Sequence, residues 1–159
     1  MVDQPGLRLG LGDSANYDGD ADLVFTHIYG PLPKQLIGKP AIINVYGNKR
    51  AKAEAWCGTE LREVSKWGRG LTNTLYSNFD PNFDVSDLVE EEFAPGRGWM
   101  PLELPARILQ PFTAGMFSIC DPFMGRGTIG KACKINGLGY VGIDRDPDRV
   151  ALAREYLGC

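Results

Sequence analysis

Several features that would assign a protein to a familiar class are missing from this chain of 159 residues. Its four cysteines form no CxxC pair, which argues against a zinc site and suits a reducing compartment. No apolar run approaches the ~18 residues of a membrane span, and the N-terminal residues lack the basic-then-apolar order of a signal peptide. We therefore expect a soluble, cytoplasmic protein with no membrane partner.

Basic charge and histidine are also scarce. The formal net charge is -3 and His27 is the only histidine, so no overall positive field would attract nucleic acid. Any basic surface must therefore be local. The cations that could form one are Lys49, Arg50, Lys52, Arg62, Lys66 and Arg69. The same residues equally fit the solvated face of a helix.

The order of the predicted elements favours a single α/β domain. A hydrophobic content of 43% over this length suffices for one well-buried core. Short β-branched and aromatic runs predict strands, and apolar residues three and four apart predict helices. Strands are expected over residues 7–11, 22–29, 41–46 and 71–79, and helices over 49–67 and 101–109. Gly58 and Thr59 provide a point at which the first of these helices could divide.

The last third of the chain has the clearest pattern. It predicts a strand over residues 116–120, a helix over 128–136 ended by Gly137, and a strand over 139–143. A final helix over 146–157 would begin with Asp146 as N-cap and Pro147 in its first position. Alternating strands and helices of this kind predict a mainly parallel sheet with helices on both faces.

Residues 121–128 (DPFMGRGT) connect a predicted strand to a predicted helix and indicate a ligand site. Asp121 stands at the strand tip, where a carboxylate can bind an ammonium group directly or through water. Gly125 and Gly127 permit a ligand to approach the backbone and allow the torsions of a tight turn. The helix that begins near Thr128 offers free N–H donors in its first turn. A nucleotide-like molecule fits such a site.

Two classes of nucleotide ligand have to be weighed. Residues 125–130 satisfy GxGxxG, and Asp144 ends the next predicted strand, as in dinucleotide sites. In a dinucleotide fold, however, several strand–helix units follow the glycines, whereas only 29 residues follow Gly130. Asp121 could pair with the ammonium group of an amino acid, and Asp144 could accept both ribose hydroxyls. S-adenosyl-L-methionine, a cationic amino acid joined to adenosine, suits two acids better than a pyrophosphate does.

These segments resemble the amino-methylating DNA methyltransferases. Residues 121–128 look like the DPFxGxGT cofactor motif of that family, and residues 142–147 resemble the acidic segment that follows it. Residues 99–104 (WMPLEL) are similar to the KPLxL element that precedes the glycine motif. Residues 12–13 and 22–26 look like the approach to the catalytic DPPY tetrad. The order is that of the subgroup whose catalytic half comes first.

The resemblance implies a Rossmann-like methyltransferase fold in permuted order. Residues 1–67 would form the catalytic half, residues 68–98 a short connector, and residues 99–159 the cofactor-binding half. S-adenosyl-L-methionine would be the cofactor, DNA the methylated partner, and no metal would take part. The cofactor-binding residues that the resemblance implies are Asp13, Pro101, Leu102, Asp121, Pro122, Phe123, Gly125, Gly127, Thr128 and Asp144.

The catalytic tetrad is altered in this chain. The family has Asp, Asn or Ser followed by two prolines and an aromatic residue, whereas this chain reads THIYGP from Thr26. With one residue missing, His27 takes the acidic position and Tyr29 the aromatic one. The resemblance thus implies Thr26, His27 and Tyr29 as catalytic residues. The imidazole would accept a hydrogen bond from the target amine, and the tyrosine ring would stack on a base turned out of the duplex.

The connector is short for this family. Residues 68–98 stand where the family carries a target-recognition region of many tens of residues, and Glu90 to Glu92 would repel DNA phosphates. We expect low sequence selectivity, or recognition supplied by a partner subunit or a second copy of the chain. One alternative is a degenerate methyltransferase fold that binds the cofactor and serves as a binding or regulatory subunit. Another is an enzyme that acts on S-adenosyl-L-methionine itself or on a small molecule.

Overall fold

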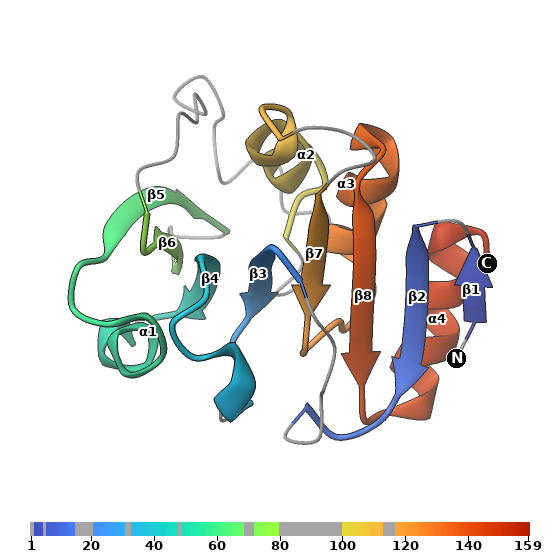
Figure 1. The fold of residues 1–159 in the computed structure, drawn as a ribbon, viewed down its shortest axis with the longest axis horizontal. Helices are drawn as coiled ribbons and strands as arrows, with labels where there is room; N and C mark the ends of the chain where they lie inside the picture. Colours follow the sequence, from blue (N-terminus) through green and yellow to red (C-terminus); the bar gives the residue numbers. More distant parts are fainter. Residues whose placement is uncertain are drawn as a thin grey trace.

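The computed structural model describes residues 2–4, 6–14, 21–30, 33–47, 49–68, 72–79, 100–112 and 117–159 (Figure 1). In this part of the chain eight strands form one sheet, in the order β1-β2-β8-β7-β3-β4-β6-β5. The strands are β1 (Val2–Gln4), β2 (Leu7–Leu11), β3 (Leu23–His27), β4 (Ala41–Tyr46), β5 (Arg62–Trp67), β6 (Asn73–Ser77), β7 (Ser118–Asp121) and β8 (Gly139–Asp144). The helices are α1 (Arg50–Cys57), α2 (Glu103–Leu109), α3 (Thr128–Asn136) and α4 (Pro147–Leu157), with a 3-10 turn η2 (Lys34–Leu36).

The centre of the sheet is parallel, as the sequence predicts. Strands β2, β8, β7, β3 and β4 pair in parallel, whereas β1, β6 and β5 pair antiparallel at the two sides. The chain order is permuted, because β2 from the N-terminal end adds to the sheet beside β8 from the C-terminal end. Helix α4 contacts both of these strands, and the two chain ends lie close together (Figure 1). The beginning and the end of the chain therefore build one continuous parallel sheet.

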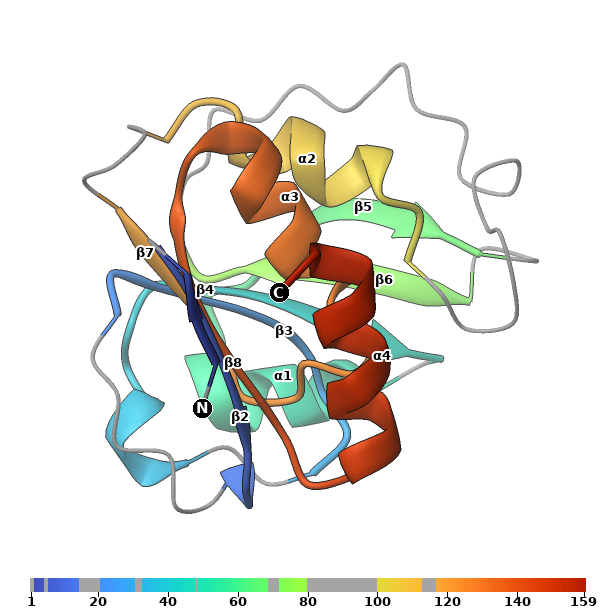
Figure 2. The same ribbon diagram turned by 90° about the vertical axis from the view of Figure 1, so that its right-hand side faces the viewer.

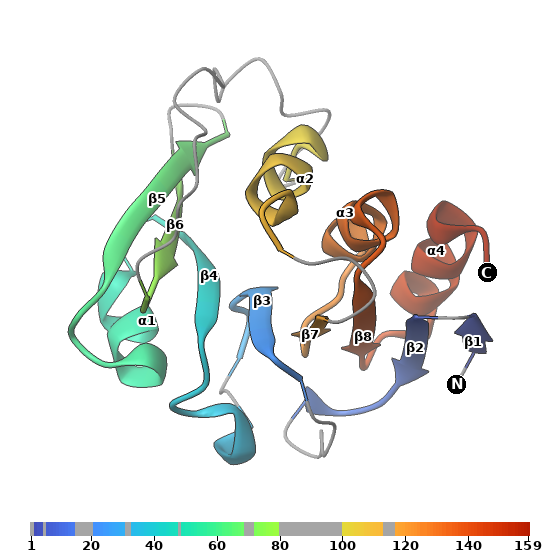
Figure 3. The same ribbon diagram turned by 45° about the horizontal axis from the view of Figure 1, so that its top comes forward.

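Helices cover both faces of the sheet. Helices α2, α3 and α4 lie on one face and α1 lies on the other (Figures 2 and 3). Strand β3 shows why, since Leu23 and Phe25 pack in the core beneath α2 to α4, while Val24 packs in the core beneath α1. Consecutive buried residues therefore point to opposite faces, and the strand is apolar on both faces over residues 23–25. None of the helices in the described ranges is long and apolar enough to cross a membrane.

The prediction of a helix over residues 49–67 is wrong in its second half. Helix α1 ends at Cys57, and residues 62–67 form β5, which pairs with β6. Gly58 ends the helix because its φ of 82° lies outside the helical region and suits a glycine cap. Leu61 and Val64 match the helical spacing only by coincidence. Residues 62–67 are extended because they pair with β6, and Val64 lies at an irregularity of that pairing between Glu63 and Ser65.

The other predicted elements are confirmed with small changes of boundary. Strands β2 and β4 and helix α3 have the predicted bounds, and Gly137 caps α3 in the left-handed conformation. Helix α4 begins at Pro147 with Asp146 as its N-cap, as predicted. The strand predicted over residues 116–120 is observed as Ser118–Asp121, which ends one residue later than predicted. The predicted strand over residues 71–79 is observed as Asn73–Ser77, and most of the connector lies outside the described residues.

Gly142 of β8 makes room for the tyrosine beside it. A Cβ atom at position 142 would lie 2.5 Å from the Tyr140 hydroxyl and 2.7 Å from the Met124 sulfur. We expect Gly142→Ala to lower the free energy of unfolding by about 1–3 kcal/mol, because the overpacked ring has to move. Urea unfolding would measure this change. Gly139→Ala on the same strand is the control, since its Cβ would meet neighbours at 3.5 Å, and equal losses would contradict the prediction.

Candidate functional site

The parallel strands bring the predicted residues to one edge of the sheet. Asp121 ends β7, Asp144 ends β8, His27 ends β3, and Asp13 follows β2. The backbone N–H of Gly12 donates to the Asp144 carbonyl at 3.0 Å, which fixes the end of β2 beside β8. From β3 the chain continues to the neighbouring strand β4 on one side of the sheet, and from β7 it continues to β8 on the other side. The gap between β3 and β7 is therefore a topological switch point, and such points commonly hold ligands.

Two neighbouring cavities occupy this edge. The first, which we call the β7 cavity, has a volume of about 280 Å³. The second, the β8 cavity, has a volume of about 240 Å³. Tyr29, Phe123 and Arg149 line both, so the two cavities are adjacent. Of the predicted residues, the β7 cavity includes His27, Asp121, Gly125 and Thr128, and the β8 cavity includes Asp13, Pro122 and Asp144.

Asp121 is a buried carboxylate with both oxygens engaged by the protein. Its Oδ1 accepts from the Thr26 hydroxyl at 2.5 Å, and its Oδ2 accepts from the Tyr140 hydroxyl at 2.8 Å. Burial raises the pKa of Asp121 to about 7, although these hydrogen bonds favour the ionised form. Thr26 is fully buried and lies behind the cavities rather than in them. It therefore joins the end of β3 to Asp121.

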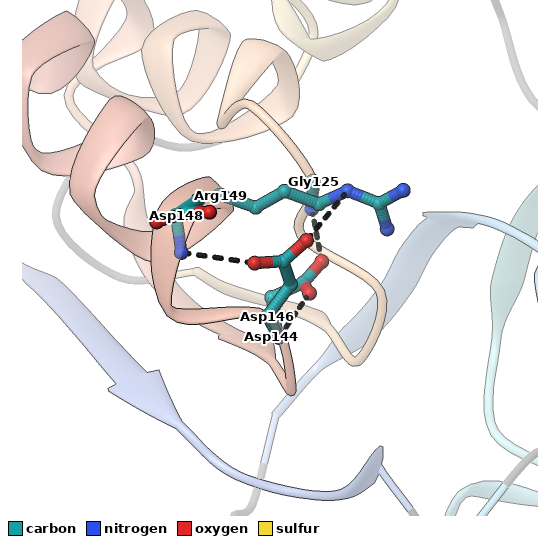
Figure 4. Close-up of polar contacts among 5 residues, drawn as sticks. All are labelled: Gly125, Asp144, Asp146, Asp148 and Arg149. Atoms are coloured by element: carbon teal, nitrogen blue, oxygen red, sulfur yellow. Dashed lines mark hydrogen bonds and ion pairs between the residues drawn. The ribbon is translucent and has the colours of Figure 1, made fainter.

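Asp144 anchors the glycine turn and the start of α4. Its Oδ2 accepts from the Gly125 N–H at 2.9 Å, and its Oδ1 accepts from the Asp146 N–H at 2.9 Å (Figure 4). Asp146 in turn accepts from the Asp148 N–H at 2.9 Å, and the Arg149 side chain extends from α4 beside it. The Asp144 carboxylate is thus held in place at the cavity wall.

The two glycines of the turn serve different purposes. A Cβ at Gly125 would meet no atom within 4 Å, and its N–H is directed to Asp144. A Cβ at Gly127 would lie 3.2 Å from the Ala153 Cβ on α4. Both have positive φ, of 56° and 86°. Gly125 leaves the β7 cavity open, whereas Gly127 allows α3 and α4 to pack closely.

His27 and Tyr29 form a stacked pair at the rim of the β7 cavity. Their ring centroids lie 4.4 Å apart at 23°, and the Tyr29 hydroxyl lies 3.4 Å from the His27 Nδ1. Trp67 meets the imidazole edge-on at 6.5 Å. Burial, and secondarily the charge of Lys49, lower the pKa of His27 to about 4, so the imidazole is neutral at pH 7. A neutral imidazole has one nitrogen able to accept a hydrogen bond.

Two other predicted residues lie outside these cavities. Leu102 lines a third, more apolar cavity of about 490 Å³, together with Thr128. Pro101 directly precedes Leu102 in the sequence. It is buried and lines none of the cavities described. Met100 lines both the β7 cavity and the third cavity, which joins the segment before α2 to the site.

Sequence reasoning missed several residues of the site. Those not anticipated include Met100, Met124, Arg126, Ile129, Tyr140 and Arg149. Met124, Arg126 and Ile129 lie within or directly after the glycine motif, and this proximity could have suggested them. Arg149 and Tyr140 carried no such signal, because only the packing of β8 and α4 brings them to the site.

Similarity to known proteins extends over most of the chain. A family model described as DNA methylase, for N6 and N4 methyltransferases, matches residues 39–155, more than half of the chain. The matched range begins after His27 and Tyr29. No curated protein matches the chain.

Several solved structures share the fold. M1.HpyAVI has a TM-score of 0.66 at 16% identity, covering 96% of this chain and 99% of that chain. TTHA0409 from Thermus thermophilus, in complex with S-adenosyl-L-methionine, has a TM-score of 0.62 at 18% identity, covering 95% and 94%. The cytosine-N4-specific PvuII DNA methyltransferase has a TM-score of 0.61 at 13% identity, covering 94% and 87%. At such identities the likeness establishes the fold alone.

Proposed function

The chain belongs to the DNA methylase family, and from this premise we propose that it is an S-adenosyl-L-methionine-dependent methyltransferase. Its acceptor would be an exocyclic amine of a nucleobase in DNA, with low sequence selectivity. The observation that carries the proposal is the pair of adjacent cavities, one with Asp121 and one with Asp144, that share Tyr29 and Phe123 in their walls. A cationic ligand with an adenosine needs acids at two separate places in one site.

The residues at the two cavities fit this cofactor. Asp121 would attract its positive charge, and the open space over Gly125 would admit its amino-acid portion. Asp144 would accept from its ribose hydroxyls, because each carboxylate oxygen keeps a lone pair beyond its bond to the backbone. Asp13 and Phe123 would lie beside the adenine. The bound cofactor would supply an electrophilic methyl group.

The acceptor side depends on His27 and Tyr29. The neutral imidazole would accept a hydrogen bond from the target amine and so direct the nitrogen lone pair toward the cofactor side. Tyr29, with 61% of its surface exposed, would stack on a base turned out of the helix. Positioning of the amine is thus what this chain contributes to the reaction.

Titration with S-adenosyl-L-methionine by calorimetry would test the cofactor assignment. Asp144→Ala should weaken binding by about tenfold or more, because the ribose loses its acceptor and the Gly125 turn its anchor. Asp146→Ala is the matched control, since it removes the N-cap of α4 without removing an acid from either cavity. Absence of binding by the unaltered chain would overturn the proposal, as would equal effects of the two variants.

Transfer of labelled methyl groups to unmethylated DNA would test the reaction itself. Label that stays off DNA, although the cofactor binds, would favour a second function. In that case the chain would be a cofactor-binding or regulatory subunit, completed by a partner or by a second copy. The observation that favours this second function is the altered tetrad, in which His27 replaces the acid, Ile28 replaces one proline, and the other proline is missing.

A further inference from the structure

The candidate basic residues that the structure describes differ in their surroundings. Arg50 donates to Glu54 at 3.0 Å and lies 5.1 Å from the Tyr76 ring centroid. Lys66 pairs with Glu63 at 3.0 Å on β5. Arg69 lies outside the described residues. Lys49 and Lys52 differ from these, because both line a cavity at the site edge of the sheet.

This cavity, which we call the basic pocket, has a volume of about 330 Å³. It lies where β4 ends, on the same edge of the sheet as the β7 and β8 cavities (together, the cofactor cavities), because β3 and β4 are parallel. His27 and Tyr29 line both the basic pocket and the β7 cavity. A molecule bound in the basic pocket would therefore meet the cofactor side across the stacked His27 and Tyr29 rings.

The charge of the basic pocket is uncompensated within the described residues. Neither Lys49 nor Lys52 makes an ion pair with a described acid, and no Asp or Glu is among the residues that line the pocket. The β7 and β8 cavities, in contrast, carry acids together with cations, since Asp121 shares its cavity with Arg126, Asp144 shares its cavity with Arg145, and Arg149 lines both. Of the three described cavities that Tyr29 lines, the basic pocket is thus the one with cations and no acid in its lining, in a chain whose net charge is -3.

Aromatic surface accompanies these cations. Tyr46, which ends β4, lines the basic pocket with 56% of its surface exposed, and Tyr29 lies on the pocket's other side with 61% exposed. Lysines beside exposed aromatic rings are the combination that binds a single nucleic-acid strand, since phosphates pair with the cations and bases stack on the rings. Acidic peptides would use the cations but not the rings.

We propose that the basic pocket binds the strand that carries the target base, with Lys49 and Lys52 on its phosphates and Tyr46 under a neighbouring base. This inference rests on the proposed function and extends it by naming a nucleic-acid contact within residues 1–67. This contact would allow the chain to bind DNA without a separate recognition region. Binding through phosphates and stacking also agrees with low sequence selectivity.

A comparison of two charge-reversal pairs in the full chain tests the inference. Lys49→Glu with Lys52→Glu reverses the pocket, whereas Lys66→Glu with Lys131→Glu makes the same change in net charge at positions that line none of the described cavities. The probe is a labelled single-stranded DNA of about twelve nucleotides, titrated by fluorescence anisotropy at several salt concentrations without cofactor. The pocket pair should weaken binding about tenfold or more at low salt. It should also reduce the slope of log K against log salt by about 1.4, the value for two phosphates.

A separate variant tests the stacking of Tyr46 on a base. Tyr46→Leu should weaken binding of the DNA strand but not of an abasic strand of equal length and charge. If both charge-reversal pairs lowered the affinity for DNA equally, the change in net charge alone would explain the loss, and the inference would be overturned. Displacement of the DNA by poly-glutamate at equal charge concentration would also overturn it, because the pocket would then bind anions in general.

The cofactor titration separates this inference from the proposed function. The pocket pair should bind S-adenosyl-L-methionine as the unaltered chain does, which also shows that the variant is folded. If the unaltered chain fails to bind the cofactor or to transfer label, the proposed function fails. If it does both while the pocket pair binds and methylates DNA normally, the present inference alone fails.

Discussion

Replacing His27 by alanine should lower the rate of methyl transfer about a hundredfold while leaving cofactor affinity within about threefold. The imidazole is neutral because burial lowers its pKa to about 4, and it lies at the rim where the β7 cavity meets the basic pocket. Loss of this acceptor removes the group that would orient the amine nitrogen. It removes no acid from the cofactor cavities. Single-turnover transfer from labelled cofactor to DNA would measure the rate.

Conservative variants make this result specific. His27→Asn should retain more activity than His27→Ala, because an amide oxygen can accept the same hydrogen bond. Tyr29→Phe should also remain active, since the ring keeps its stacking surface. A folded-state pKa near 4 further predicts that ionisation of His27 causes no change in rate between pH 6 and 8. Equal rates for His27→Ala and the unaltered chain would refute the catalytic assignment.

The position of the glycine motif beside the β7 and β8 cavities could be predicted because its signals are local. Asp121 and Asp144 lie at strand ends that adjacent residues define, and Gly125 lies in the turn that follows the first of them. The N-cap Asp146 fixes where α4 begins. A strand followed by a glycine turn and a helix brings Asp121 and Gly125 close together through local structure alone. Local sequence signals are therefore enough to find the acids of both cavities.

Long-range packing could not be predicted in the same way. Tyr140 reaches Asp121 only because Gly142 and Gly130 leave space for its ring, a condition that depends on two separate elements. Strand β5 has the apolar spacing of a helix, but its partner β6 decides its conformation. The division of the basic residues also needed the structure, since α1 directs Arg50 away from the pocket that Lys49 lines.

Binding of S-adenosyl-L-methionine should strengthen as pH rises from 6 to 8, because Asp121 must lose a proton to favour a cationic ligand. Burial raises the pKa of Asp121 to about 7 in the free protein, so the carboxyl is largely protonated at pH 6. A neighbouring positive charge lowers that pKa, and affinity should then change by up to about tenfold per pH unit below 7. Calorimetry at pH 6.5 in buffers of different ionisation enthalpy should detect release of a fraction of one proton. A pH-independent affinity with no proton release would contradict the prediction.

Asp121→Asn should separate binding from stability. A pKa raised above its unfolded value contributes stability at low pH, and that stability is lost as pH rises through about 7. At pH 8 the unaltered chain therefore bears the cost of a buried carboxylate, and the amide should raise its free energy of unfolding by about 2 kcal/mol. The Thr26 hydroxyl can still donate to the amide oxygen, and the Tyr140 hydroxyl can accept from the amide nitrogen. The variant should nevertheless bind the cofactor more weakly and without pH dependence. A variant with higher stability and lower cofactor affinity would show that Asp121 serves the site through its charge. A variant that loses both stability and affinity would instead assign Asp121 a structural role.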